Sequence, residues 1–329
     1  MLFKDDEVAR ADAMAVRNAC GWYRWTHGTI DVRGADATEL LDHLLVNTVA
    51  TCKVGRERYT TMLDETGGII DDLMAMRLSN DHWWLSTLYG PQMMRWIAAH
   101  KGDADVIFED ITLDIDMYSV QGPRSVEAMD QLVADPVDGL KRFQIVDTRV
   151  GDVDVRVDRG GFTGELGFEI YCRRADSGKI ADALRATGAH EVYTLEVYVR
   201  SLPMEKGMAL RQDYHHLTPF EANLGWSVHF DQKGDFIGRA ALEQAEKDGP
   251  RWAFMGVEIE RESYEDIAQN EIVRKRGIPV GKCRQMIYGY TVDKNVGFAV
   301  VDAKKCPIGT KVTIGPNDSP ATIVEPKWC

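Results

Sequence analysis

The stretch Gly67-Gly68-Ile69-Ile70-Asp71-Asp72-Leu73-Met74-Ala75-Met76-Arg77-Leu78 opens on two glycines and continues as an apolar run that two adjacent carboxylates interrupt. This pattern is typical of a turn that enters a mostly buried strand, where an unpaired carboxylate is costly. Because neighbours in a strand point to opposite faces, Asp71 and Asp72 cannot share one environment. Two interpretations follow: one aspartate faces a pocket, or both lie at the start of the strand and serve the turn.

The composition of the chain is that of an ordinary globular protein. It has 329 residues, 44% of them hydrophobic and 28% charged, which is enough to bury a large core in two or three domains. The formal net charge of -13 argues against a non-specific nucleic-acid or anionic-membrane surface, because such surfaces need a basic face. No apolar run approaches the ~20 residues of a membrane helix. Residues 1–7 are too acidic for a secretory signal, so we expect a cytoplasmic protein.

Neither the cysteines nor the histidines predict a metal site. The six cysteines are scattered without a CxxC pair, as expected of reduced cytosolic thiols. The pair His215-His216 is the only histidine cluster, and adjacent positions seldom ligate one metal without further ligands at suitable spacing. His27 is open to two interpretations, a functional imidazole or a structural histidine, and the pattern favours the second.

Strands and helices alternate along the first part of the chain. Residues 59–63 and 69–78 flank the turn Asp64–Gly68 and should form a hairpin. Four leucines form the apolar face of a predicted helix over 34–45, which Asp36 can cap. Further strands are predicted over 21–32, 82–88, 117–120, 143–150 and 153–157, and further helices over 8–19, 91–97, 126–133 and 176–187. The order indicates a fold of mixed α and β layers.

The pattern changes near residue 245. The charged run Glu243 to Arg251 is typical of a helix end and a linker, and short strands separated by turns follow it. We expect these strands over 255–259, 277–281, 297–301, 311–314 and 321–324, in a small β-barrel-like domain. The sequence therefore predicts a first domain over 1–245 and a barrel domain over 246–329.

A glycine-rich run, Gly160-Gly161-Phe162-Thr163-Gly164-Glu165-Leu166-Gly167-Phe168-Glu169-Ile170-Tyr171, follows the predicted strand over 153–157. Its glycines would let the backbone approach a ligand closely, while Glu165 and Glu169 offer acceptors. The run lacks the lysine of a phosphate-binding loop, so a phosphate site is disfavoured.

Taken together, these segments resemble the aminomethyltransferase family, which includes the T-protein of the glycine cleavage system and folate-dependent demethylases. The resemblance covers nearly the whole chain and rests on seven motifs in the same order. They are 32–37 with 44–47, 59–72, 121–123, 161–169, 204–206, 218–226 and 235–242. The resemblance implies an α+β fold, in which a folate-binding domain of three subdomains surrounds a central cavity and a C-terminal β-barrel domain follows.

The resemblance also implies roles for single residues. Asp72 would face tetrahydrofolate near the nitrogens that carry the one-carbon unit, and would stabilise the positive charge that develops during transfer. Glu169 would hold the pterin, whose 2-amino and ring N–H edge is a donor pair seeking an acidic acceptor. The other residues assigned to the cofactor site are Tyr59, Phe162, Arg200 and Glu205.

The chain departs from the family pattern mainly around the entrance of the site. Phe162 replaces a tyrosine and keeps an aromatic wall without the hydroxyl. Thr26-His27-Gly28 stands for the usual Ser-His-Met, and Pro203-Met204-Glu205 stands for Arg-Leu-Glu. A Ser-Pro-rich segment near the C-terminus is replaced by 283–290. The pterin site is thus preserved, whereas the substrate entrance is rebuilt.

These departures favour a stand-alone enzyme that moves a methyl or methylene group from a small N-, O- or S-methylated substrate to tetrahydrofolate. A T-protein that works with a lipoylated H-protein is the disfavoured alternative, and a non-catalytic folate-binding protein is a third hypothesis. Trp22, Tyr23 and Trp25 could form an aromatic cage for a cationic donor, although core packing is the interpretation that their pattern favours.

Overall fold

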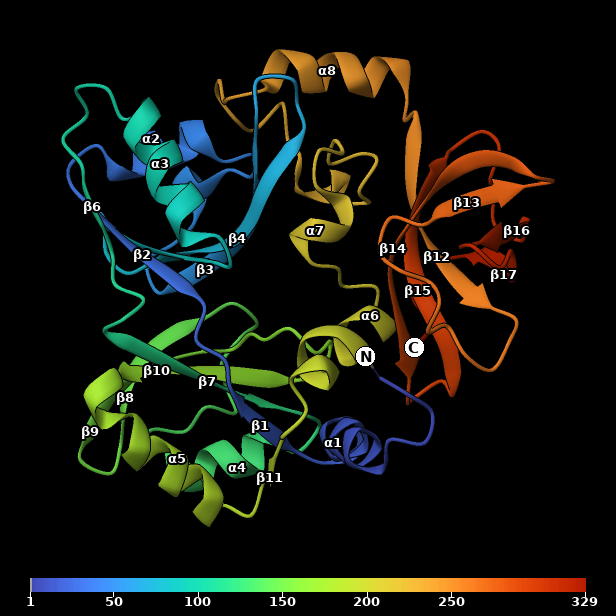
Figure 1. Cartoon of the computed structure of the whole chain (residues 1–329). Coiled ribbons are helices and arrows are strands. Elements are labelled where there is room, and N and C mark those ends of the chain that lie inside the picture. Colours follow the sequence, from blue (N-terminus) through green and yellow to red (C-terminus); the bar gives the residue numbers. More distant parts are fainter. Residues whose placement is uncertain (1) are drawn as a thin grey trace.

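The computed structural model describes residues 2–329, which form two α+β bodies and a β-barrel (Figure 1). Helix α1 (Glu7–Asn18) begins the chain, and Asp6 caps it by accepting a hydrogen bond from the backbone N–H of Ala9. Within the described residues, no helix has the length and apolar character needed to cross a membrane.

The first body is an antiparallel five-stranded sheet in the order β3-β4-β5-β2-β6. The predicted hairpin forms its edge, and Asp64 closes the turn by accepting from the backbone N–H groups of Thr66 and Gly68 at 2.9 and 3.1 Å. Helices α2 and α3 pack on one face of the sheet through Leu41 and Ile97. The elements are β2 (Gly28–Arg33), α2 (Ala37–Leu44), the 3-10 helix η1 (Val49–Thr51), β3 (Arg56–Leu63), β4 (Ile69–Arg77), β5 (His82–Thr87), α3 (Gly90–His100) and β6 (Ile107–Asp110).

The second body is a six-stranded sheet in the order β11-β1-β7-β10-β9-β8, in which only the pair of β11 and β1 is parallel. Helices α4 and α5 cover one face, where Met129 and Ile180 pack with Ile170 of the sheet. The elements are β1 (Gly21–Arg24), β7 (Ile115–Gln121), α4 (Ser125–Leu132), β8 (Ile145–Val150), β9 (Val153–Asp158), β10 (Gly167–Arg173), the 3-10 helix η2 (Arg174–Asp176), α5 (Ser177–Ala186) and β11 (His190–Glu191).

The single strand predicted over 21–32 is in fact two strands of different sheets. β1 belongs to the second body and β2 to the first, so the chain crosses between them at residues 25–27. The helix-free faces of the two sheets meet in a small cluster, in which Met76 of β4 packs with Met117 and Tyr171 of the other sheet. The two sheets therefore face one another, as the upper and lower bodies do in Figure 1.

A third part of the chain lies between the two sheets and the barrel (Figure 1). It comprises the π-helix η3 (Val197–Ser201), α6 (Leu202–Glu205), α7 (Arg211–Tyr214), the 3-10 helix η4 (Gly225–Ser227) and α8 (Arg239–Asp248). Helix α8 runs to Asp248, so the boundary predicted after residue 245 falls inside its last turn.

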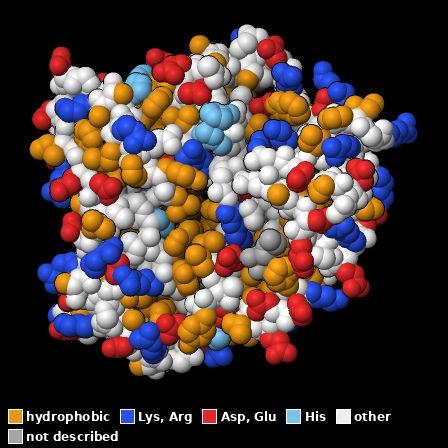
Figure 2. All heavy atoms as spheres, in the orientation of Figure 1, with side chains coloured by type: hydrophobic (Ala, Val, Ile, Leu, Met, Phe, Trp, Pro, Cys, Tyr) orange, Lys and Arg blue, Asp and Glu red, His pale blue; other side chains and the backbone are white. Residues whose placement is uncertain are grey.

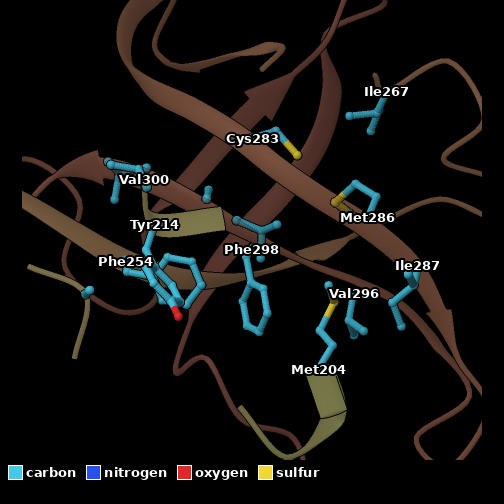
Figure 3. Packing of buried hydrophobic residues seen from close by; sticks show 14 of the residues in the cluster. Met204, Tyr214, Phe254, Ile267, Cys283, Met286, Ile287, Val296, Phe298 and Val300 are labelled. Atoms are coloured by element: carbon cyan, nitrogen blue, oxygen red, sulfur yellow. The ribbon is translucent and has the colours of Figure 1, made fainter. Parts of the chain in front are cut away.

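The C-terminal strands close into a six-stranded barrel in the order β12-β15-β14-β13-β16-β17, as the sequence predicts in kind. The strands are β12 (Trp252–Ile259), β13 (Ile272–Lys275), β14 (Ile278–Gly289), β15 (Lys294–Asp302), β16 (Lys311–Ile314) and β17 (Ser319–Val324). The prediction missed β13 and the length of β14, which includes the segment near 283–290. Figure 3 shows Met204 and Tyr214 of the third part packed among barrel side chains, with Tyr214 beside Phe254.

Candidate functional site

The strand register places a set of polar side chains on the facing surfaces of the two sheets. Asp72 and Met74 share a face of β4 with Met76, and Tyr59 and Glu57 lie opposite Met74 and Met76 on β3. On the other sheet, β10 presents Glu169 and Tyr171 on the face that meets Met76. Asp72 lies four residues before Met76 on β4, or about 13 Å along the strand. The facing surfaces thus carry one acidic group near Asp72 and another near Glu169.

Asp72 is held in an aromatic setting. Its Oδ2 accepts a hydrogen bond from the Tyr59 hydroxyl at 3.1 Å, and the Tyr59 ring stacks on Trp226 with centroids 5.5 Å apart. Burial raises the pKa of Asp72, and the hydroxyls of Tyr214 and Tyr59 and the charge of Arg211 oppose that rise. The Tyr214 hydroxyl is buried and forms no hydrogen bond within residues 2–329. The structure thus brings Asp72 and Tyr59 together.

Asp71 points to the opposite face of β4 and has a different role. Its Oδ2 accepts from the Thr87 hydroxyl at 2.7 Å, and its Oδ1 accepts from the backbone N–H of Asp72 at 2.9 Å. Burial raises its pKa to about 7, against the effect of the Thr87 hydrogen bond. The two aspartates therefore occupy separate environments, as the alternation predicts, and neither serves the turn.

Glu169 belongs to a second acidic group that spans both sheets. Its Oε2 accepts from the Tyr171 hydroxyl at 2.9 Å, and Asp158 of β9 is its cross-strand neighbour. Glu57 of the first sheet completes the group, which we call the carboxylate cluster (Glu57, Asp158 and Glu169). Burial raises the pKa of Glu57 to about 8 and of Glu169 to about 7, and the nearby Glu169 charge raises that of Glu57 further. The pKa of Asp158 is raised well above its ordinary value by burial and then by Glu57.

Aromatic rings line the inner face beside Glu169. Phe162 lies 6.0 Å from Trp25 between centroids, and Trp25 meets Tyr198 edge-on at 5.4 Å. Tyr23 stacks on Tyr198 at 5.3 Å. Trp22 instead points into the core of the second body, where it packs near Tyr118. A cage made of Trp22, Tyr23 and Trp25 is therefore not formed, because adjacent strand residues face opposite ways.

Arg200 and Glu205 contact other parts of the molecule. Arg200 donates from Nη1 to Oε1 of Gln285 on β14 at 2.9 Å, which places it at the barrel junction. The Glu205 side chain is fully buried, and Arg17 and Thr291 engage both of its carboxylate oxygens. A cofactor role for Glu205 stays a prediction, and its contacts favour a structural role instead.

A buried amide shapes the glycine-rich run. Gln121 donates to the carbonyl of Gly160 at 3.0 Å and accepts from the Thr163 hydroxyl at 2.7 Å. A Cβ at Gly161 or Gly167 would lie 2.0 or 2.2 Å from the Gln121 Nε2. These two glycines are therefore required by Gln121. Glu165, expected as a ligand acceptor, pairs instead with Arg17 and Lys206 at 2.9 and 3.0 Å.

Sequence reasoning missed Glu57, Asp158, Tyr171 and Tyr214. Glu57 and Tyr171 each stand two residues from a predicted site residue on the same strand, so period-2 alternation could have found them. Asp158 and Tyr214 reach the site only through tertiary packing. The carboxylate cluster is not a metal site by its geometry: within residues 2–329, no group of three or more His, Cys, Asp or Glu side chains is arranged to hold a metal ion.

The fold defined by the two facing sheets and the barrel is known from a solved structure. The crystal structure of the glycine cleavage system aminomethyltransferase T from Bartonella henselae superimposes with a TM-score of 0.87 at 22% sequence identity. The match covers 98% of this chain and 89% of that one. It confirms the predicted α+β fold with its C-terminal barrel.

Sequence comparisons then define the family. Residues 3–232 match the family model described as the GCVT N-terminal domain, and residues 253–328 match the glycine cleavage T-protein C-terminal barrel domain. The aminomethyltransferase of Bacillus pumilus (strain SAFR-032) is 30% identical over 318 residues, or 91% of this chain and 84% of the relative. That of Bacillus cereus (strain B4264) is 29% identical over 326 residues, covering 91% and 83%. The chain belongs to the aminomethyltransferase family and is an enzyme of the transferase class.

Proposed function

We propose that this enzyme is a tetrahydrofolate-dependent one-carbon transferase. The observation that carries the proposal is the pair of partly buried acidic groups on the facing sheets, Asp72 with Tyr59 and Glu169 with Tyr171. A binding module would need an anchor for the pterin ring, but it would have no use for a second partly buried carboxylate held by a hydroxyl. The second carboxylate therefore favours a catalyst over a non-catalytic folate-binding protein.

The residues present fit a reduced folate. The 2-amino and N3–H edge of the pterin is a donor pair that a carboxylate such as Glu169 can accept. One Glu169 oxygen is already oriented by Tyr171, and both Asp158 oxygens are buried without a hydrogen-bond partner among the residues that the structure describes. Phe162 and Trp25 offer aromatic faces beside this edge. The site therefore has acceptors in excess and aromatic walls, as a flat ring rich in N–H groups requires.

Asp72 would act at the reacting end of the cofactor. Bound tetrahydrofolate supplies a nucleophilic ring amine that accepts the one-carbon group. The Asp72 carboxylate, fixed by the Tyr59 hydroxyl, would stabilise positive charge at that position and hold the proton that leaves it. Its raised pKa suits the second task, because a more basic carboxylate retains a proton better.

We propose a small methylated cation as the donor. The Asp72 carboxylate lies beside the rings of Tyr59 and Trp226, and negative charge next to aromatic faces favours a methylated ammonium or sulfonium group. Trp226 is 59% exposed, so its ring can meet a ligand that arrives from solvent. Methyl transfer would then release the donor as a neutral amine or thioether.

An aminomethyl group carried by a lipoylated H-protein is the second candidate donor. The names of the relatives, which are aminomethyltransferases, favour this donor. The hydrogen bond between Arg200 and Gln285 joins the barrel to the third part of the chain near the site. A cytoplasmic location stays a prediction.

The test is calorimetric titration with tetrahydrofolate, followed by mass spectrometry of the folate after incubation with donors. Wild type should bind tetrahydrofolate, and Glu169→Ala should bind at least about tenfold more weakly, since it loses hydrogen bonds to a charged acceptor. The donor panel holds methylated amines, sulfonium compounds, aryl methyl ethers and an aminomethylated lipoyl H-protein. The donor that yields a methyl or methylene folate decides between the two candidates. Absence of folate binding by folded wild type would overturn the proposal.

A further inference from the structure

We propose that Glu57 and Asp158 are specificity-determining residues that act with Glu169 to bind the ring of a reduced folate and to reject fully oxidised folate. This inference rests on the proposed function, because it concerns the same ring. If Glu169 alone held the pterin, the carboxyl groups of Glu57 and Asp158 would have no function in binding. The inference gives both groups such a function.

Geometry puts the three carboxyl groups at one place. Asp158 and Glu169 are cross-strand neighbours on the inner face of the second sheet. Glu57 reaches them from the first sheet: a Cβ built on Gly160 would lie 2.6 Å from Oδ1 of Asp158 and 3.0 Å from Oε1 of Glu57. Gly160 is thus flanked by both side chains, and the cluster bridges the two sheets.

The cluster has more hydrogen-bonding capacity than the protein uses. The Asp158 side chain is fully buried, and within residues 2–329 neither of its oxygens has a hydrogen-bond partner. The Tyr171 hydroxyl donates to Glu169 instead. Arg56 and Arg142 are the cations whose charge lowers the pKa of Glu57, and in the described part of the chain neither forms an ion pair with it. Unpaired buried carboxylates are costly, so the cluster holds protons until a ligand provides donors.

A partly protonated cluster matches the edges of a reduced pterin. An ionised carboxylate accepts two hydrogen bonds, which suits the 2-amino and N3–H pair. A protonated carboxyl both donates and accepts, which suits the neighbouring N1 acceptor and N8–H donor. N8 carries a hydrogen in dihydro- and tetrahydrofolate but not in fully oxidised folate. A carboxyl group that must accept from N8–H therefore distinguishes the two oxidation states, because oxidised folate leaves it facing a lone pair.

Ligand binding should also move protons. The groups that face the cluster are Arg56 beside Glu57 on β3, Arg142 in the loop before β8, Tyr171 on β10 and Tyr198 on the π-helix. Since burial raises the pKa of both tyrosines well above the ordinary range, Glu57 and Glu169, with pKa values of about 8 and about 7, are the groups of this set that titrate near neutrality. Donors from a ligand stabilise the ionised form, so binding should release protons and strengthen as the pH rises towards 8.

The experiment is calorimetry with tetrahydrofolate and with folic acid in two buffers of different ionisation enthalpy. Wild type should prefer tetrahydrofolate by about tenfold or more and should release protons at pH 7. Glu57→Leu and Asp158→Leu should lose most of that preference. Glu57→Gln and Asp158→Asn should keep part of it, because an amide donates and accepts as a protonated carboxyl does, while the number of protons released falls.

Thermal unfolding and a control variant separate these effects from misfolding. Asp158→Asn should raise the melting temperature at pH 8 and raise it less at pH 5, because the pKa of the buried acid is elevated and its ionisation destabilises the fold at high pH. Asp147→Asn, at an exposed position of the neighbouring strand β8, should change neither binding nor proton release. Folded leucine variants that keep both affinity and preference would overturn the inference and leave the proposed function intact. A wild type that binds neither folate would overturn both.

Discussion

The two adjacent aspartates show how one strand separates a structural carboxylate from a candidate catalytic one. Asp71 is buried and satisfied by Thr87 and a backbone N–H, whereas the one hydrogen bond that the Asp72 side chain accepts within the described residues comes from the Tyr59 hydroxyl. A satisfied buried acceptor contributes to stability, and an under-satisfied one contributes to function at the expense of stability. Substitutions at the two positions should therefore have different effects.

Asp72→Asn should reduce the rate of one-carbon transfer about 10²–10³-fold, the loss typical of removing one preorganised charge partner. Its melting temperature should stay the same or rise, because a partly buried carboxylate becomes a neutral amide. Asp71→Ala should instead lower the free energy of unfolding by about 1–3 kcal/mol, since it leaves the Thr87 hydroxyl without its acceptor. Turnover assays and urea unfolding on both variants check this. An Asp72→Asn enzyme with wild-type turnover would remove Asp72 from the chemistry.

His27 gives the protein a defined sensitivity to acid. Burial lowers the pKa of its imidazole from 6.5 to about 4, and its Nδ1 lies 2.8 Å from the Ser86 hydroxyl. The neutral form is therefore the stable one: stability is fully present above pH 6.5 and is lost as the pH falls towards 4. The loss amounts to about 3 kcal/mol at most.

Other buried acids shift stability in the opposite direction over the same range, so the comparison must be made between wild type and His27→Gln. The variant should lose less stability than wild type between pH 7 and pH 4.5 in urea titrations. Parallel curves for the two proteins would contradict the assigned pKa.

At the scale of elements, the glycine-rich run and the strand end at Gln121 form one unit. The Gln121 side chain hydrogen-bonds to Gly160 and Thr163 inside the loop, and the loop needs glycine at positions 161 and 167 to pass the amide. Gly161 has φ +137, a backbone conformation that is strained for a residue with a Cβ. At Gly167 a larger residue is disfavoured only because its Cβ would collide with the Gln121 side chain.

Gly167→Ala should therefore be destabilising by about 1–3 kcal/mol, and Gln121→Ala should relieve part of that loss in the double variant. The double-mutant cycle measures the coupling, which we expect to be favourable by about 1 kcal/mol. Gly178→Ala is the matched control, because a Cβ there meets no atom within 4 Å. Additive effects of the two substitutions would show that the loop and the amide are independent.

Elements were predictable from the sequence wherever the signal was local. The hairpin around Asp64, the barrel class and the opposite faces of Asp71 and Asp72 all follow from turn residues and period-2 alternation. The crossing of the chain between the two sheets at residues 25–27 could not be predicted, because the strand pattern continues through it while the hydrogen-bonding partners change. Strand β13 was also missed, since its residues 272–275 alternate over only four positions. Asp158 and Tyr214 reach the site by packing between bodies, which no local pattern encodes.

At the scale of the whole molecule, the barrel supports the site through the third part of the chain. Tyr214 meets Phe254 of the barrel edge-on, with centroids 6.2 Å apart, and its hydroxyl influences the pKa of Asp72. Loss of barrel packing should therefore disturb the surroundings of Asp72 through Tyr214.

The surface shown in Figure 2 gathers hydrophobic side chains near its centre, with Lys and Arg side chains close by.

Glu205 is the clearest test of this coupling, and of its own role. Its carboxylate accepts from Arg17 of α1 at 2.9 Å and from the backbone and hydroxyl of Thr291 in the barrel at 2.8 and 2.6 Å. Its carbonyl accepts from the backbone N–H groups of Trp328 and Cys329. The Arg17 side chain is only 5% exposed, so removing Glu205 leaves a buried charge whose one remaining carboxylate partner among the described residues is Glu165. One residue thus joins the start of the chain, the third part and the barrel.

Glu205→Ala should lower the free energy of unfolding by about 3–5 kcal/mol, as expected for half of a buried ion pair. Glu127→Ala, which breaks the exposed pair with Arg124, is the control and should have no measurable effect. The folded fraction of Glu205→Ala should bind tetrahydrofolate with nearly wild-type affinity, because the carboxylate is consumed by protein contacts. Urea unfolding and calorimetry at low temperature distinguish the two roles: a stable variant that fails to bind would assign Glu205 to the cofactor, and an unstable variant that binds assigns it to the fold.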